Sequence, residues 1–224
     1  IGHPFLGPGE TNRALIEKFF IEKPDAEMAL SNNLVTLANE RASGEDRAVS
    51  FCWVMHLMGD LHQPLHAASR VTTKKPGGEG LGGNHLVLDP RKKPREQRTN
   101  LPSFWDQLPG VSPGYRPVAE LAEELAKLKP YSVAEIRQNR TIAQWVQESY
   151  RHAAIFAYSE QHVRFIYSED ARAGSISDSD IPTLTTEYVH EAGEIARRRL
   201  ALAGQRLAGQ LGRVFKMAPG GFLL

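Results

Sequence analysis

The stretch 51–66, FCWVMHLMGDLHQPLH, constrains the fold most, because it places three histidines and an aspartate inside an apolar run. A carboxylate or an imidazole is costly to bury unless another group pairs with it. Two explanations account for such a run. Either these side chains satisfy one another and the nearby backbone in an ordinary core, or they bind a cation.

The spacing within this stretch is compatible with a shared cation site but does not by itself favour one. His56 and Asp60 are four residues apart, so on a helix they lie one turn apart on the same face. Pro64 ends the helix, and His66 follows where its side chain is able to turn back toward the same place. Nitrogen and oxygen donors of this kind suit zinc. A simple hydrogen-bonded pair explains the same spacing, and His62, about 240° around the helix from His56, is interpreted as a core or supporting histidine.

A second candidate region lies further along the chain. Asp106 closes the stretch NLPSFWD (100–106), and residues 82–84 are Gly-Gly-Asn, a predicted tight turn whose glycines permit close backbone approach. These residues also have purely structural interpretations: Trp105 could pack in the core, and Asp106 could cap a helix.

Apolar periodicity predicts a largely helical chain. Helices are expected over 26–43, 46–63, 119–128, 133–167 and 183–215. The helix 46–63 is apolar on nearly every side, so it is expected at the centre of the core. Residues 1–12 are predicted to be irregular, and residues 69–104 hold a short strand at 85–88 with 70–73 as its candidate partner. The prediction is therefore one all-α domain spanning 1–224, with one irregular excursion containing short β structure.

Bulk composition excludes several classes of protein. The chain has 27 basic and 26 acidic residues, and a net charge of +1 creates no global field for nucleic acid or membranes. No apolar run approaches the roughly 18 residues of a membrane span. The single cysteine, Cys52, excludes an internal disulfide framework. Basic residues gather within 69–104, where a solvated loop and a basic rim beside an anion site are both possible interpretations.

Taken together, the motifs resemble the S1/P1 nuclease family, whose superfamily includes zinc-dependent bacterial phospholipase C. The matching order is H-x-x-x-D-x-H-Q-P-L-H, then G-G-N, then N-L-x-x-x-W-D. WVQESYRHA (145–153) and AGQRLAGQL (203–211) are similar to further segments of the family. The resemblance implies an all-α fold, a cluster of up to three zinc ions and secretion or a periplasmic location. It also implies cleavage of single-stranded DNA and RNA, and of 3′-nucleotides, leaving 5′-phosphate ends.

The resemblance also implies which residues carry the chemistry. His56 and Asp60 would be zinc ligands, with Asp60 as the catalytic carboxylate that bridges two ions. His66 and Asp106 would bind the remaining zinc. IGHPFLGPGE (1–10) resembles the W-H-Y-I-N-x-P-F segment of the family, which would make His3 a ligand as well.

The sequence departs from the family pattern in two places. Pro102 stands where the family motif has a histidine, and His85, its possible substitute, is expected to face solvent. The family's N-terminal tryptophan, histidine and aspartate ligands have no counterpart before His3, so the chain is expected to lack that segment. Two alternatives therefore stay open: a zinc phosphodiesterase of the phospholipase C type, and a degenerate family member that binds phosphate-containing ligands without turnover.

Overall fold

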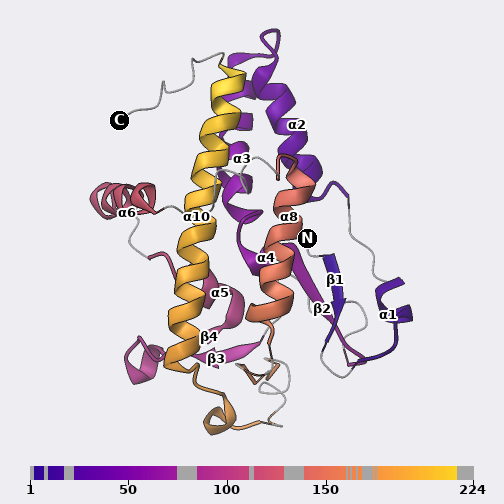
Figure 1. Cartoon of the computed structure of the whole chain (residues 1–224), viewed down its shortest axis with the longest axis vertical. Coiled ribbons are helices and arrows are strands. Elements are labelled where there is room, and N and C mark those ends of the chain that lie inside the picture. The colour runs from indigo at the N-terminus through magenta and orange to yellow at the C-terminus, as the bar shows by residue number, and fades with distance from the viewer. Residues whose placement is uncertain are drawn as a thin grey trace.

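The computed structural model describes residues 3–7, 10–17, 23–74, 85–110, 114–128, 139–159, 161, 163–164, 166–167, 174 and 176–215. As predicted, the fold is helical, with two short two-stranded sheets (Figure 1). The α-helices are α1 (Ala14–Glu17), α2 (Ala26–Ala38), α3 (Gly44–Asp60), α4 (Pro64–Ala67), α5 (Leu101–Asp106), α6 (Tyr115–Lys127), α8 (Ile142–His152) and α10 (Thr186–Val214). Short 3-10 turns occupy Pro94–Glu96 (η1) and Asp178–Asp180 (η3), and a π-helical turn, η2, spans Ala153–Ala157.

The long helix α10 runs along the molecule, with α3 and α8 beside it and α6 standing out to one side (Figure 1). Thr185 caps its start, because the Thr185 side chain accepts a hydrogen bond from the Tyr188 amide. The helix predicted over 183–215 is thereby confirmed. The helix predicted over 119–128 begins earlier, at Tyr115, and the one predicted over 26–43 ends at Ala38.

Helix α3 carries the motif-rich stretch and has well-defined ends. Ser43 Oγ accepts a hydrogen bond from the Asp46 amide at 3.0 Å, and it donates to the Asp46 carboxylate at 2.7 Å. This arrangement satisfies a free amide of the first turn. The helix ends at Asp60, before the predicted residue 63, because the chain turns over 61–63 and restarts as α4 at Pro64.

The prediction that this helix lies at the centre of the core is wrong for one of its sides. Val54, Leu57 and Met58 are buried within a cluster that includes residues of α2 and α10. In contrast, Trp53 and Met55 keep 49% and 46% of their surface exposed. The neighbouring helices cover one side of α3, and its other side stays open despite its apolar residues.

The strand pairing also differs from expectation. The predicted irregular N-terminal segment contains β1 (His3–Leu6), which pairs in parallel with β2 (Ala68–Val71). The strand expected at 85–88 is present as β3 (Leu86–Leu88), but 70–73 is not its partner. Instead β3 pairs antiparallel with β4 (Arg98–Asn100), while 68–71 is already paired with β1.

The helix predicted over 133–167 is shorter in the structure. Residues 129–138 lie outside the described part of the chain, and regular α-helix spans Ile142–His152. The chain then makes the π-helical turn η2, and Tyr167 forms an antiparallel bridge with His85. Tyr158 is buried and its ring lies 5.4 Å from that of Phe5, so core packing at this point turns the chain away from the helix axis.

The turn after α3 is held in two hydrophobic clusters at once. Leu61 and Ala67 belong to the cluster of α2, α3 and α8, together with Leu30 and Trp145. Residues Leu65 and Ala68 belong to the cluster around Phe104, Trp105 and Tyr188. Since residues of 61–68 are anchored in both clusters, the polar side chains between them have defined positions.

Candidate active site

The first candidate pair lies on the last turn of α3. His56 Nε2 lies 3.2 Å from Asp60 Oδ2, which confirms that the i,i+4 spacing places both groups on one face. The His56 side chain is 63% exposed and the Asp60 side chain 36% exposed. Both groups are therefore accessible to a ligand from solvent.

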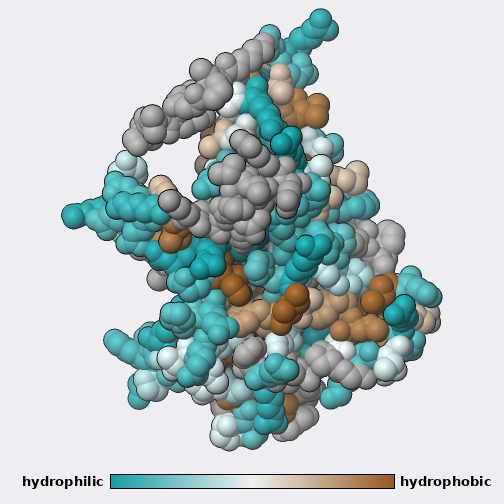
Figure 2. Space-filling model, viewed as in Figure 1, coloured by the Kyte–Doolittle hydropathy of each residue, from teal (hydrophilic) through white to brown (hydrophobic). Residues whose placement is uncertain are grey.

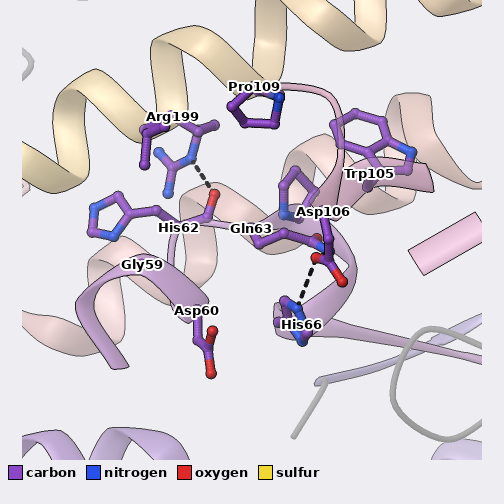
Figure 3. Close-up of a pocket in the computed structure, with 12 residues that line it drawn as sticks. Gly59, Asp60, His62, Gln63, His66, Trp105, Asp106, Pro109 and Arg199 are labelled. Atoms are coloured by element: carbon purple, nitrogen blue, oxygen red, sulfur yellow. Dashed lines mark hydrogen bonds and ion pairs between the residues drawn. The ribbon is translucent and has the colours of Figure 1, made fainter. Parts of the chain in front are cut away.

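The second pair joins α4 to α5. His66 Nε2 lies 3.2 Å from Asp106 Oδ1, and Gln63 Nε2 donates to the same oxygen at 2.9 Å (Figure 3). Burial acts to raise the pKa of Asp106, but the hydrogen bonds from His66 and Gln63 outweigh it and lower that pKa below its ordinary value. Asp106 is thus held as a carboxylate.

The alternative explanation for Asp106, a helix N-cap, is wrong. Asp106 is the last residue of α5, and Asn100 caps that helix by accepting from the Ser103 amide at 2.8 Å. Core packing of Trp105 is confirmed, since its ring is 1% exposed and its Nε1 donates to the Tyr188 hydroxyl at 3.0 Å.

One cavity of about 180 Å³ gathers most of these groups (Figure 3). Asp60, His66 and Asp106 line it, although they come from α3, α4 and α5. Gln63 and Arg199 also line it, and neither was among the residues predicted for the site. The cavity is therefore lined by one residue of the first pair, Asp60, and by both residues of the second pair, His66 and Asp106.

His62 is a core histidine, as predicted, although it lies in the turn beyond the end of α3 and not on the helix. Its ring is 1% exposed, Nδ1 lies 2.7 Å from the Met58 carbonyl, and Arg206 Nη1 lies 2.9 Å from Nε2. Because an arginine only donates, Nε2 accepts and the proton resides on Nδ1. Burial, followed by the charges of Arg199 and Arg206, lowers the pKa of His62 well below its ordinary value, so the ring is neutral.

Glu148 of α8 is the centre of a buried ionic network. Arg206 donates to its two carboxylate oxygens at 2.7 and 2.8 Å, and Arg199 donates to Oε2 at 2.6 Å. Burial acts to raise the pKa of Glu148, but the hydrogen bonds from Arg206 and Arg199 outweigh it and lower the pKa to about 2. Glu148 and Arg206 belong to the segments 145–153 and 203–211 that resemble the family.

This network also fixes the turn that carries the site. Arg199 Nε donates to the His62 carbonyl at 3.2 Å, and Ser149 Oγ donates to the Leu61 carbonyl at 2.7 Å. Carbonyls at a helix C-terminus lack partners within the helix, so these contacts satisfy them. The available sequence signal was Arg199 and Arg206, seven residues apart and thus on one face of α10.

His3 lies apart from the residues that line the cavity. It is on β1, and its Nε2 lies 3.2 Å from Oε1 of Glu27 in α2. The sequence did not indicate Glu27, because the pairing depends on how β1 packs against a helix 24 residues away. The assignment of His3 as a ligand stays a prediction.

His85 does not face solvent, and that expectation is wrong. It is fully buried, with its ring 5.0 Å from the Tyr167 ring and 6.1 Å from the Tyr158 ring. The strand pairing of β3 and the bridge to Tyr167 place it inside the fold. The predicted turn at residues 82–84 lies outside the described part of the chain.

The donors fit zinc in type and spacing but not in number. Two ligands of a tetrahedral zinc at about 2.0 Å lie about 3.3 Å apart, which agrees with the 3.2 Å separations in both pairs. Zinc sites take three or four protein ligands. Within the described residues, no group of three or more histidine, cysteine or acidic side chains is arranged to hold a metal.

The position of Pro102 accounts for part of this shortfall. Pro102 is in the first turn of α5, where the missing amide is tolerated. It precedes Asp106 by four residues, so a side-chain donor at this position would share the face of α5 that carries Asp106. A histidine there would add a third donor to the His66–Asp106 pair.

Comparison with protein families gives a match over most of the chain. A family model described as S1/P1 Nuclease matches residues 22–216. None of the curated proteins compared with the chain matches it. Among the described helices, none combines the length and apolarity needed to cross a membrane.

Proposed function

Because the chain belongs to the S1/P1 nuclease family, we propose that it is a zinc-dependent hydrolase of phosphodiester bonds. Its substrates are single-stranded DNA and RNA and 3′-nucleotides, and its products carry 5′-phosphate ends. The observation that supports this proposal most is the single cavity that Asp60, His66 and Asp106 line from three different helices. Secretion or a periplasmic location is part of the same proposal and rests on family membership.

The residues that would hold zinc are His56 and Asp60 at one position and His66 and Asp106 at another. Bound zinc would lower the pKa of a coordinated water and neutralise charge on the phosphate oxygens. Gln63 positions Asp106, and the network around Glu148 positions the turn that follows Asp60. The cationic Arg199 lines the cavity but is already paired with Glu148, so its main role is to hold that turn.

A preference for single strands has a candidate basis in Trp53. Its ring is 49% exposed and lies edge-on to His56, with 6.0 Å between the ring centroids. An unpaired base is able to stack on an exposed aromatic face, whereas a base within a duplex already stacks on its neighbours. Trp53 is therefore the proposed stacking surface beside the His56–Asp60 pair.

The test is cleavage of a single-stranded oligonucleotide by protein that has been stripped of metal and then supplied with zinc. We expect no cleavage after chelation, cleavage when zinc is added, and loss of at least about 100-fold in kcat for Asp60→Asn. The matched control is Glu45→Gln, a neutralised carboxylate in the first turn of the same helix. Cleavage that is equally fast with chelator or in Asp60→Asn contradicts the proposal.

A further inference from the structure

The connection between β3 and β4 concentrates positive charge on one side of the molecule. It spans residues 89–97, DPRKKPREQ, and we call it the basic loop. The surface around β3 and β4 is mainly hydrophilic in the view of Figure 2. The charged members of the loop are Arg91, Lys92, Lys93, Arg95, Asp89 and Glu96. Because the chain as a whole carries a net charge of only +1, this loop creates a local positive potential that the whole molecule lacks.

Hydrogen bonds fix the shape of the basic loop. The buried carboxylate of Asp89 accepts from Arg91 Nε at 2.9 Å and from Arg91 Nη2 at 2.7 Å. The Asp89 amide donates to the Gln97 carbonyl at 2.8 Å, and the Glu96 amide donates to the Lys93 carbonyl at 2.8 Å. The loop therefore presents its basic side chains from a defined backbone, which lowers the entropy that is lost when they bind a ligand.

Two contacts hold the basic loop against α5, the helix that ends at Asp106. Lys92 Nζ donates to Gln107 Oε1 at 2.5 Å. The Arg91 guanidinium lies over the Phe104 ring, with 4.8 Å between its central carbon and the ring centroid, which is a favourable cation–π distance. Phe104 and Gln107 lie on either side of Asp106 in the sequence. The loop therefore lies beside the Asp106 end of the candidate active site.

Lys93 and Arg95 are the cations of the loop that remain available to a ligand. Both are exposed, and in the part of the chain that the structure describes neither side chain has a hydrogen bond or an ion pair. In contrast, the carboxylate of Asp89 balances the charge of Arg91. Exposure alone would suit a solvated loop, but these two like charges are held two residues apart and repel each other. An anion bound between them would relieve that repulsion.

The size of the cavity requires a polynucleotide to lie mostly outside it. The cavity measures about 180 Å³, below the roughly 300–1,000 Å³ of pockets that enclose small organic ligands. An oligonucleotide with one phosphate in the cavity must therefore lay its other nucleotides across the surrounding surface. Proteins that bind single strands combine cations along the backbone with aromatic rings for the bases. The basic loop supplies such cations, and Trp53 supplies a ring beside the His56–Asp60 pair.

We propose that the basic loop binds the phosphate backbone of a single-stranded polynucleotide on the Asp106 side of the cavity, with Lys93 and Arg95 as the contacting cations. This inference rests on the proposed function and deepens it, because it assigns the surface that favours a polynucleotide over a 3′-mononucleotide. A 3′-mononucleotide has a single phosphate, and when the cavity holds that phosphate none remains for the loop.

The test measures how zinc-loaded protein binds a short fluorescent strand without bases, by fluorescence anisotropy at salt concentrations from about 50 to 200 mM. Phosphorothioate linkages keep the charge of the strand and resist hydrolysis, and the missing bases remove stacking on Trp53. Each phosphate that a cation neutralises contributes about 0.7 to the slope of log affinity against log salt for a single strand. Lys93→Gln combined with Arg95→Gln should therefore reduce the slope by about 1.4, so that wild type loses roughly sevenfold more affinity than the variant over this range.

The matched control is Arg13→Gln combined with Arg41→Gln, which removes the same charge from exposed positions before α1 and before α3. It should leave the slope unchanged. An unchanged slope in the Lys93→Gln, Arg95→Gln variant, or an equal reduction in the control, overturns the proposal. Equal affinity of wild type for polyglutamate of the same length also overturns it, because the surface would then select acidic chains in general.

A cleavage assay separates this proposal from the proposed function. Where both hold, the Lys93→Gln, Arg95→Gln variant lowers kcat/KM for a single-stranded oligonucleotide more than it lowers kcat/KM for a 3′-mononucleotide. Zinc-dependent cleavage with an unchanged salt slope overturns the loop proposal and keeps the proposed function. Binding that depends on Lys93 and Arg95, without cleavage of any phosphodiester, supports the loop proposal and overturns the hydrolase function.

Discussion

Gln63 Nε2 donates to Asp106 Oδ1 at 2.9 Å across 43 residues of sequence, and His66 contacts the same oxygen. The other end of the Gln63 side chain caps α4, because its Oε1 accepts from the Leu65 amide. The Gln63 side chain therefore links the start of α4, the helix that carries His66, to the carboxylate of Asp106.

Replacing Gln63 should weaken metal binding without unfolding the protein. Removal of a group that orients a metal ligand typically lowers metal affinity by about 10–100-fold, and we expect Gln63→Leu to fall in this range for zinc. Competition with a chelating dye measures the affinity. Gln107→Leu is the control, since Gln107 neighbours Asp106 but accepts from Lys92 instead. Equal zinc affinity in Gln63→Leu and wild type would refute a positioning role.

Pro102→His should strengthen zinc binding. The new imidazole would lie on the face of α5 that carries Asp106 and add a third donor to the pair with His66. Since an orienting group is worth about tenfold or more in affinity, a direct ligand should contribute at least as much. Elemental analysis after dialysis checks the zinc content per chain. Ser103→His places the same side chain on another face of α5 and should leave the zinc content unchanged.

Glu148→Gln should destabilise the fold strongly. The substitution leaves Arg199 and Arg206, whose side chains are 2% and 4% exposed, without their carboxylate. Breaking a buried pair in this way costs about 3–5 kcal/mol. Urea denaturation gives the free energy of unfolding, with Glu191→Gln as a control at an exposed position of α10. A change in the free energy of unfolding below about 1 kcal/mol would show that water solvates Arg199 and Arg206 in place of the lost carboxylate.

The contribution of Glu148 should depend on pH. Its pKa is about 2 in the folded protein, against an ordinary value of 4.5, so the unfolded chain binds the proton more readily. Stability from this group is therefore fully present above about pH 4.5 and is lost as the pH falls toward 2. The difference in unfolding free energy between wild type and Glu148→Gln, measured from pH 7 to pH 3, should shrink in that window. If the difference in unfolding free energy between wild type and Glu148→Gln stays constant from pH 7 to pH 3, the stabilisation has a cause other than the ionisation of Glu148.

Trp53→Ala should weaken binding of single strands. Stacking of one base on an aromatic ring contributes about 1–3 kcal/mol, and we expect a loss of this size for a fluorescent oligonucleotide. Fluorescence anisotropy with metal-free protein measures binding without cleavage. Tyr115→Ala is the control, because Tyr115 is 89% exposed on α6 and has no part in the proposed site. Equal losses in both variants would argue against stacking on Trp53.

Local features of the site were predictable from the sequence. The i,i+4 spacing of His56 and Asp60 led to a contact of 3.2 Å, which follows from helix geometry, a property of neighbouring residues. The burial of His62 was also predicted, but His62 lies in the turn beyond the end of α3, so helical phase is not its cause. The exposed side of α3 was not predictable in the same way, because an apolar residue is buried only where another element covers it.

The sequence by itself determined the helical fold, the family and the residue types available for a site, since helix periodicity and motif order are carried within short segments. Only the tertiary structure decided the partners of charged side chains that no motif had paired. His3 pairs with Glu27 over 24 residues, and Arg206 pairs with Glu148 over 58. These partners depend on how helices and strands pack, and packing arises from the shapes of all the buried surfaces together.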